Sequence, residues 1–270
     1  MSVPPKRYPR VSKILIVISA ILWSVPALAE DQALSELFFQ QGVQGTIVIS
    51  SLNGGTTFIH NDLRSGQRFS PASTFKIPNT LIALEEKAIA GKDDIFKWDG
   101  RIHDFAAWNH DQTLASAFKV SCVWCFQELA RRIGAEKYQK YLRDLDYGEW
   151  REPFIETTFW LDGSLQISAL EQVNFLRRVY LRELPFSEHS YETLKQIMLV
   201  EKENTYTMWA KTGWAARMAP QVGWYVGYVE TPTDVWIFAT NMEIRDEKDL
   251  ELRQKLTRAA LQVKGVITAL

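Results

Sequence analysis

The chain has 270 residues, a formal net charge of -1 at pH 7, and hydrophobic residues at 46% of its positions. This composition is typical of a globular protein and excludes a disordered or fibrous one. The near-neutral charge, with basic and acidic residues interspersed, argues against a nucleic-acid partner. The length suits one large domain, or two lobes that share one core.

Residues 1–29 have the pattern of a secretory signal peptide. Basic residues between positions 6 and 13 precede an apolar stretch over residues 14–25, and Ala27-Leu28-Ala29 forms a cleavage site. The alternative is a membrane anchor, but the apolar stretch is too short to span a bilayer comfortably. We therefore expect a mature chain of residues 30–270 that is periplasmic, without a stable membrane anchor, in an oxidising compartment.

A β-hairpin and then a helix follow. Residues 44–50 and 56–60 are rich in β-branched and apolar side chains, and Asn53-Gly54-Gly55 between them favours a turn. In the stretch 70–76, Ser70 can cap a helix and Pro71 suits its first position.

Ser73 and Lys76 share one face of this helix, since they are three residues apart. A serine hydroxyl is a weak nucleophile until a base removes its proton, and a lysine can do so when burial lowers its pKa. The S-x-x-K pattern alone is weak, because Ser116-Ala117-Phe118-Lys119 matches it inside an ordinary helical pattern. By itself, the pair is equally compatible with a structural helix start.

Two further motifs offer partners for this pair. Ser121, in Ser121-Cys122-Val123, could relay a proton. Lys211-Thr212-Gly213 combines a cation, a hydroxyl and a residue without Cβ, which suits a strand edge that binds an anionic substrate. The alternative is an edge strand that carries a protective lysine. Together, S-x-x-K and K-T-G strongly favour the functional interpretation over the structural one.

The remaining elements are helices and a second pair of strands. Ser168 and Glu171 form a capping box, and residues 187–201 are another helix candidate. Residues 222–230 and 235–241 predict strands joined by a turn, and residues 249–263 predict a final helix. The side chains expected to be buried are Leu170, Val173, Leu176 and Val179 in the capped helix, and Leu252, Leu256, Ala259, Ala260 and Val263 in the final one.

Strands from both chain ends, with helices between them, predict an α+β fold. We expect an antiparallel sheet formed from both chain ends, with flanking helices and an inserted helical lobe. A cleft between the sheet and this lobe is the natural place for a site.

The motifs together resemble the class D, oxacillinase-type serine β-lactamases, which share a fold with penicillin-binding transpeptidases. The resemblance covers essentially all of the mature chain, and the pattern is most similar to the carbapenem-hydrolysing group. It implies ring opening of β-lactam antibiotics through an acyl-enzyme. The stretches that carry it are 71–76, Ser121 with Val123, Tyr147-Gly148, Phe159-Trp160-Leu161-Asp162-Gly163, Lys211-Thr212-Gly213-Trp214, and the spacing from residue 96 through Trp108-Asn109.

The resemblance also implies a role for each matching residue near the nucleophile. Ser73 would form the acyl-enzyme, and Lys76 would carry a carbamate made from carbon dioxide. Trp160 would hydrogen-bond this carbamate, while Val123 and Leu161 would keep it dry. No other cofactor is implied. Without the resemblance, Trp160 and Leu161 would be interpreted as core residues.

The other matching residues would surround the substrate. Ser121 would pass a proton to the leaving nitrogen, and the backbone N–H groups of Ser73 and Trp214 would form the oxyanion hole. Trp108 would line the mouth of the cleft, although it could equally be a packing residue. The substrate carboxylate would be held by Lys211, Thr212, Gly213 and Arg217, of which Arg217 could instead pair with a surface acid.

One position departs from the family pattern. The family usually has Tyr-Gly-Asn where this chain has Tyr147-Gly148-Glu149, and an ionised glutamate cannot donate the hydrogen bonds that an asparagine can. If this position orders the loop before Trp160, the change bears on the geometry of that loop or on the substrate range, and we assign Glu149 no catalytic role.

Cys122 and Cys125 are the chain's two cysteines. A metal site is not predicted, since there is no second pair and the four histidines show no ligand spacing. Two alternatives stay open: buried free thiols, or an intramolecular disulfide, which export favours.

Three functions are compatible with these residues. A β-lactamase would release its acyl product rapidly, a β-lactam sensor domain would stay acylated and signal, and a transpeptidase would normally be anchored and larger. A sensor needs retained membrane segments, and this sequence shows only a cleavable signal peptide. We therefore expect hydrolysis. The short segment 214–221 resembles that of carbapenem-hydrolysing relatives and predicts carbapenem turnover.

Overall fold

The structure is a computed structural model that describes residues 1–2, 30–53 and 55–268. The predicted signal peptide falls almost entirely on residues 3–29, outside the described residues. No helix among the residues described combines the length and the apolar composition that a bilayer crossing needs.

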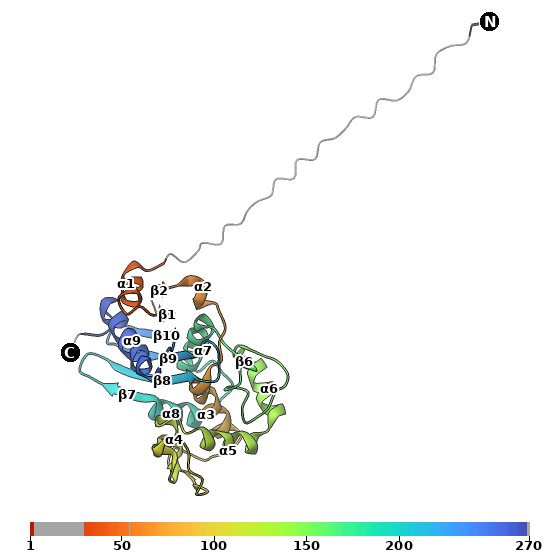
Figure 1. The fold of residues 1–270 in the computed structure, drawn as a ribbon, viewed down its shortest axis with the longest axis vertical. Coiled ribbons are helices and arrows are strands. Elements are labelled where there is room, and N and C mark those ends of the chain that lie inside the picture. Colours follow the sequence, from red (N-terminus) through yellow and green to blue (C-terminus); the bar gives the residue numbers. More distant parts are fainter. Residues whose placement is uncertain (3–29, 54, 269–270) are drawn as a thin grey trace.

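A six-stranded antiparallel sheet forms the centre of the molecule, in the order β2-β1-β10-β9-β8-β7 (Figure 1). The predicted hairpin β1–β2 pairs through β1 with β10, so both chain ends build this sheet, as predicted. Its strands are β1 (Gly45–Ser51), β2 (Thr57–His60), β7 (Leu199–Lys202), β8 (Thr207–Ala215), β9 (Val222–Glu230) and β10 (Val235–Glu243). Two small sheets pair β3 (Ile95–Phe96) with β4 (Gln112–Thr113) and β5 (Glu149–Trp150) with β6 (Leu165–Gln166).

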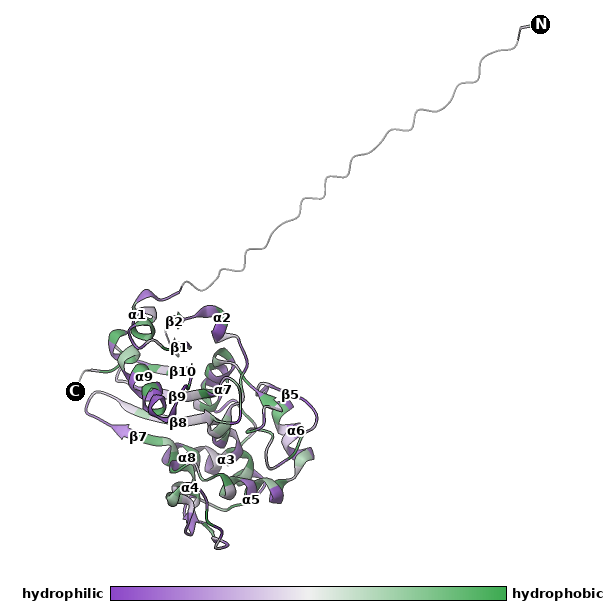
Figure 2. Cartoon of the chain, viewed as in Figure 1, coloured by the Kyte–Doolittle hydropathy of each residue, from purple (hydrophilic) through white to green (hydrophobic). Residues whose placement is uncertain are grey.

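Helices cover both faces of the large sheet. Side chains of β1 alternate between two apolar clusters: Ile47 and Ile49 pack with α1 (Gln32–Gln40) and α9 (Leu252–Val263), whereas Val48 packs with α7 (Ala169–Leu181). Figure 2 shows helices with both apolar and polar residues, as expected for elements packed on one side only.

The helical lobe lies between β2 and β7 in the chain and packs beside the edge that carries β8 (Figure 1). Together with the sheet, its elements form the larger of the two apolar clusters. They are η1 (Ala72–Phe75), α3 (Lys76–Glu85), η2 (Ala106–Trp108), α4 (Leu114–Lys119), α5 (Val123–Ile133), α6 (Ala135–Asp144) and α8 (Glu188–Met198). Outside this lobe, α2 (Asp62–Ser65) lies beside β1 and β2, and η3 (Glu247–Glu251) leads into α9.

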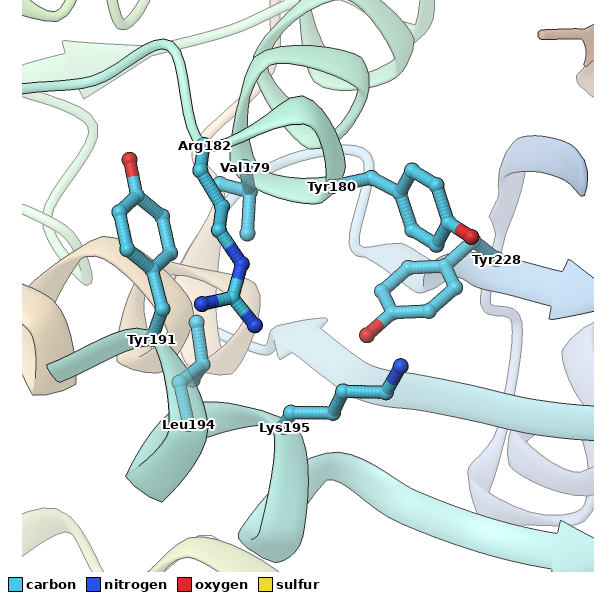
Figure 3. Close-up of a pocket in the computed structure, with 7 residues that line it drawn as sticks. All are labelled: Val179, Tyr180, Arg182, Tyr191, Leu194, Lys195 and Tyr228. Carbon is cyan, nitrogen blue, oxygen red and sulfur yellow. The ribbon is translucent and has the colours of Figure 1, made fainter. Parts of the chain in front are cut away.

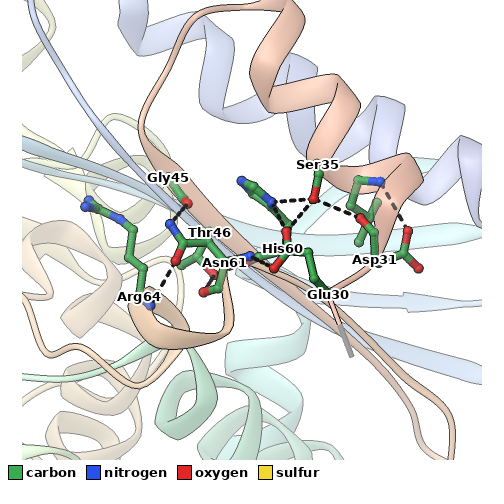
Figure 4. A network of polar contacts seen from close by, with 9 residues as sticks. Glu30, Asp31, Ser35, Gly45, Thr46, His60, Asn61 and Arg64 are labelled. Carbon is green, nitrogen blue, oxygen red and sulfur yellow. Dashed lines mark hydrogen bonds and ion pairs between the residues drawn. The ribbon is translucent and has the colours of Figure 1, made fainter. Parts of the chain in front are cut away.

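The first residues of the predicted mature chain are fastened to the hairpin (Figure 4). The Glu30 carboxylate accepts a hydrogen bond from the backbone N–H of Asn61 at 2.8 Å and lies 2.6 Å from Nδ1 of His60. Asp31 caps α1 by accepting from the backbone N–H of Leu34 at 3.1 Å. These contacts make Glu30 part of the folded domain.

Two predicted apolar faces need correction. The capping box of Ser168 and Glu171 is present, but Leu170 is 38% exposed, because Ala169 takes the buried position in the first turn of α7. In α9, Val263 is 51% exposed and Leu261 is buried instead. The buried stripe of α9 includes Thr257, whose hydroxyl bonds that of Thr240 at 2.6 Å, so hydropathy alone misplaced the face.

A strand also replaces the end of a predicted helix. The helix expected over 187–201 ends at Met198, and Leu199–Lys202 forms β7, paired with β8 at the edge of the sheet. Residues 199–202 form a strand because they pair with β8, and the local sequence periodicity carries no information on this partner.

Candidate active site

The turn before Ser73 is held by the carbonyl of Trp160. The prediction that Ser70 caps the helix is wrong: its hydroxyl donates to the Trp160 carbonyl at 2.9 Å, and Pro71 occupies the N-cap position. The backbone N–H of Ala72 donates to the same carbonyl at 3.0 Å. Ala72 has φ of 48°, a left-handed conformation that a non-glycine residue adopts only when its surroundings enforce it.

η1 and α3 bring Ser73 and Lys76 into contact. The Nζ of Lys76 donates to the Oγ of Ser73 at 3.1 Å. Lys76 is 1% exposed, and its Nζ lies 4.9 Å from the centre of the Phe126 ring. Burial lowers the pKa of Lys76 to about 7, so much of the amine is neutral at neutral pH. A neutral amine beside a hydroxyl can accept its proton.

Lys211 and Ser121 form a second amine–hydroxyl pair. The Nζ of Lys211 donates to the Oγ of Ser121 at 2.5 Å and to the carbonyl of Thr212 at 3.2 Å. Lys211 is 4% exposed. Its pKa falls well below the ordinary value, first through burial and then through the positive charges of Lys76 and Arg253. The amines of Lys76 and Lys211 are therefore close enough for their charges to interact.

The nucleophile's turn and β8 touch at Gly213. A Cβ on this residue would lie 2.9 Å from the Pro71 carbonyl oxygen and 3.0 Å from Cγ2 of Thr74. In addition, the indole N–H of Trp224 donates to the Ser70 carbonyl at 2.9 Å. The absence of a side chain at Gly213 thus allows the K-T-G strand to lie directly against the turn that carries Ser73.

Arg253, a partly buried cation beside this strand, was not predicted from the sequence. Its Nη1 donates to the Gly213 carbonyl at 2.6 Å, and burial lowers its pKa to about 10. No carboxylate of the described residues pairs with it. Arg217, which was predicted to bind the substrate carboxylate, lies exposed on the turn after β8. The available signal was the helical spacing that places Arg253 on the buried face of α9 with Leu256 and Thr257.

The residues predicted to enclose the amine of Lys76 differ in how deeply they are buried. Trp160 is fully buried and stacks on Phe75 at 5.6 Å, and its indole N–H has no partner among the described residues. Leu161 and Val123 are partly buried. Trp108 is half-buried, and its indole N–H donates to the Val120 carbonyl at 3.0 Å. Trp108 is therefore fastened to the residue before Ser121.

Trp214 lies in β8 directly after Gly213, and its indole N–H donates to Oε1 of Gln221 at 2.9 Å, across the turn that follows the strand. Glu149 lies apart from these groups, exposed on β5, with its carboxylate 2.5 Å from the guanidinium of Arg68. Arg68 also pairs with Glu171, so the unusual glutamate belongs to a surface ion-pair network.

A cavity of about 200 Å³ lies apart from these groups, between α7, α8 and the sheet (Figure 3). Its lining includes two cations, and both have carboxylate partners: Lys195 pairs with Glu230 at 2.7 Å, and Arg182 pairs with Glu188 and Glu192. Figure 3 shows the Lys195 ammonium and the Tyr228 hydroxyl pointing into this space. None of the predicted site residues lines it.

Comparisons with known proteins agree with this geometry. The family model "Penicillin binding protein transpeptidase domain" matches residues 48–262. The chain is 41% identical to "Beta-lactamase OXA-48" of Klebsiella pneumoniae over 95% of this chain and 97% of that protein, and 39% identical to "Beta-lactamase OXA-2" of Salmonella typhimurium over 92% and 93%. Among solved structures, the class D β-lactamase YbXI from Nostoc is 41% identical (TM-score 0.84, 86% of this chain and 98% of that one), and FUS-1 from Fusobacterium nucleatum is 36% identical (TM-score 0.86, 89% and 100%).

Proposed function

We propose, since this chain belongs to the class D serine β-lactamases, that Ser73 attacks the β-lactam carbonyl and that Lys76 accepts the proton of its hydroxyl. The chain is thus an enzyme that hydrolyses the β-lactam amide. The observation that carries the assignment is the 3.1 Å hydrogen bond between Lys76 Nζ and Ser73 Oγ, made by an amine that is buried and has no carboxylate partner among the described residues. Ser73 is itself only partly buried, so a substrate can reach it.

Ser121 and Lys211 then handle the proton of the leaving nitrogen. Ring opening needs a donor at that nitrogen, and the Ser121 hydroxyl, bonded to the Lys211 ammonium, can give its proton and regain one from the lysine. The backbone N–H groups of Ser73 and Trp214 are the proposed oxyanion donors, supported by the close approach of Gly213 to the nucleophile's turn.

The substrate carboxylate is proposed to lie at the open edge of β8. Lys211, Thr212 and Arg217 were expected to hold it, and Arg253 adds a partly buried positive charge at the Gly213 carbonyl of the same strand. Because Arg253 is fixed by the Gly213 carbonyl and Arg217 is exposed, we assign the larger share of carboxylate binding to Arg253.

Carboxylation of Lys76 by carbon dioxide fits the residues present. Carbon dioxide reacts with a neutral amine, and burial favours that form of Lys76. The unpartnered, buried indole N–H of Trp160 is a donor suited to such a group, and Val123 and Leu161 would limit its contact with water. When bound, the group would supply a negatively charged base in place of the amine. Added bicarbonate should then raise activity most at acid pH, and an equal effect at all pH values would contradict this.

Carbapenems are the proposed finer substrate class, and the periplasm the proposed location. The first proposal is supported by the 214–221 segment, whose turn is closed by the Trp214–Gln221 hydrogen bond. Decay of imipenem with purified enzyme tests it, and no decay above the uncatalysed rate would overturn it.

The proposed periplasmic location rests on the predicted signal peptide, and a mature N-terminus other than Glu30 in a periplasmic extract would contradict that cleavage site.

Turnover separates hydrolysis from the alternative roles. Steady hydrolysis of a chromogenic cephalosporin, many molecules for each enzyme, is the expected result. A sensor domain or a transpeptidase would instead give one stoichiometric burst and a stable acyl-enzyme, which mass spectrometry detects as an added mass on Ser73.

A further inference from the structure

The two cysteines lie beside the proposed proton relay. The structure joins Cys122 and Cys125 in a disulfide, and both residues are fully buried. Cys122 directly follows Ser121 and is the N-cap residue of α5. The bridge therefore links the turn that carries Ser121 to the first turn of the helix.

The disulfide stands where other helices of this protein have a capping oxygen. The Sγ of Cys122 lies 3.2 Å from the backbone N–H of Cys125, and sulfur is a weak acceptor. A sulfur cap would hold the first turn of α5 only weakly, and the covalent link between Cys122 and Cys125 adds the constraint that the weak hydrogen bond does not provide. Among the described α-helices, those with an oxygen cap are α1, α2, α4, α7 and α8, capped by Asp31, Asn61, Thr113, Ser168 and Ser187.

Ser121 itself needs such a constraint. Its φ of 57° is a left-handed conformation, which a residue with a Cβ keeps only where neighbouring contacts enforce it. On the side of α4, backbone hydrogen bonds run from Ser121 to Phe118 at 3.3 Å and from Cys122 to Ala117 at 2.9 Å. On the side of α5, the disulfide is the covalent tie next to this turn.

The same helix reaches the proposed base. Phe126 follows Cys125 on α5, and its ring lies 4.9 Å from Lys76 Nζ. Trp124, between the two cysteines, donates its indole N–H to the Trp108 carbonyl at 2.9 Å. The bridge thus fixes a segment that contacts both amine–hydroxyl pairs.

We propose that the Cys122–Cys125 disulfide is a positioning element that holds the Ser121 hydroxyl at Lys211, so that full activity requires oxidation of this pair. Forming the bond removes two electrons and two protons from the two thiols, and these pass to a thiol–disulfide oxidoreductase or to glutathione disulfide, which is reduced to two thiols. This proposal rests on the proposed function, because Ser121 matters only if it relays a proton.

The experiment compares cysteine variants in two backgrounds. Cys122→Ala/Cys125→Ala should lower kcat about tenfold on a chromogenic cephalosporin and leave KM within twofold, because the carboxylate contacts on β8 and α9 are intact. In a Ser121→Ala background the same two changes should lower kcat less than twofold, since the hydroxyl to be positioned is gone. Cys122→Ser/Cys125→Ala restores a capping oxygen without the cross-link and should remain at least fivefold below the parent. Ser187→Ala, which removes the cap of α8, is the control and should keep kcat within twofold.

Several results would overturn the proposal. Unchanged kcat in the double cysteine variant, or the full tenfold loss again in the Ser121→Ala background, would exclude positioning of Ser121 by the bridge. Failure of every cysteine variant to fold would make the bridge a requirement of the fold, not of the site. Normal kcat in Ser121→Ala would overturn the proton relay of the proposed function, and positioning with it. Loss of kcat in Ser121→Ala but not in the cysteine variants would overturn positioning alone.

Discussion

Lys76 and Lys195 each lie beside an aromatic ring, and they differ in what neutralises their charge. Lys195, in the cavity of Figure 3, has its Nζ 4.8 Å from the Trp209 ring and 2.7 Å from the Glu230 carboxylate. Lys76 lies at nearly the same distance from the Phe126 ring, but its polar partner is the hydroxyl of Ser73. The aromatic surroundings are similar, and only Lys195 has a carboxylate.

The difference explains why one lysine is suited to chemistry. The side chain of Lys195 is 38% exposed and its charge is balanced by Glu230, so it contributes packing and a surface ion pair. Lys76 is buried without a balancing charge, which lowers its pKa to about 7 and makes a neutral amine available. A stability cost at Lys76 is thus linked to its reactivity.

Replacing the unpaired amine should have the largest effect. Lys76→Ala removes the base for both attack by Ser73 and attack by water, so kcat should fall by about 10³-fold or more. Steady-state hydrolysis of a chromogenic cephalosporin measures the loss, and mass spectrometry shows whether an acyl-enzyme accumulates. Near-normal turnover would show that Lys76 is not the base.

The pH dependence should follow the same amine. Protonated Lys76 can neither accept the proton of Ser73 nor react with carbon dioxide, and its pKa of about 7 means that the protonated fraction grows as the pH falls below 7. Activity should therefore fall about tenfold per pH unit below 7, or about 100-fold at pH 5, and level off above pH 8. A flat profile of kcat between pH 5 and 8 would contradict a titrating base.

The two arginines near β8 offer a similar contrast, between the partly buried Arg253 and the exposed Arg217. Arg253→Ala should raise KM about 10- to 100-fold, because a charge-assisted hydrogen bond to the substrate carboxylate contributes roughly 1.5–3 kcal/mol. Arg217→Ala should raise KM by a few-fold at most, since its exposed charge is screened by solvent. A larger increase in KM for Arg217→Ala than for Arg253→Ala would show that Arg217 is the main residue that binds the carboxylate, as predicted from the sequence.

These contrasts also show what the sequence can and cannot predict. Ser73, Lys76 and Lys211 could be predicted as site residues because their chemistry lies in short motifs, and the sheet could be predicted from β-branched and apolar segments at both chain ends. The partner of Lys211, the position of Arg253 and the pairing of β7 depend on contacts between distant segments. Ser70 could not be assigned correctly for the same reason, since its partner, the Trp160 carbonyl, is 90 residues away.

Removing the charge but keeping the volume should make the protein inactive and more stable. Lys76→Met replaces a buried amine whose pKa is about 7 in the folded protein and about 10.5 in the unfolded chain. Burying the charged amine therefore destabilises the fold at every pH at which the unfolded chain would be protonated there. The folded state is penalised fully below pH 7, and the penalty disappears as the pH rises toward 10.5. At pH 6, Lys76→Met should therefore raise the free energy of unfolding by about 2–4 kcal/mol, with a smaller gain at pH 9.5. Urea unfolding at both pH values measures this, and equal gains would exclude the buried charge as the cause.

The paired lysine should give the smallest effect of all. Lys195→Met and Glu230→Gln each break an ion pair whose side chains are 38% and 30% exposed, so each should change the free energy of unfolding by less than about 1 kcal/mol. Because the cavity of Figure 3 contains none of the proposed catalytic groups, kcat should stay within twofold of the parent in both variants. A loss of kcat beyond tenfold in Lys195→Met, without a matching loss in Glu230→Gln, would mean that this lysine acts on the cleft through Trp209, two residues before Lys211 on β8. The contrast between a structural and a catalytic lysine would then fail, since exposure and pairing would no longer separate the two.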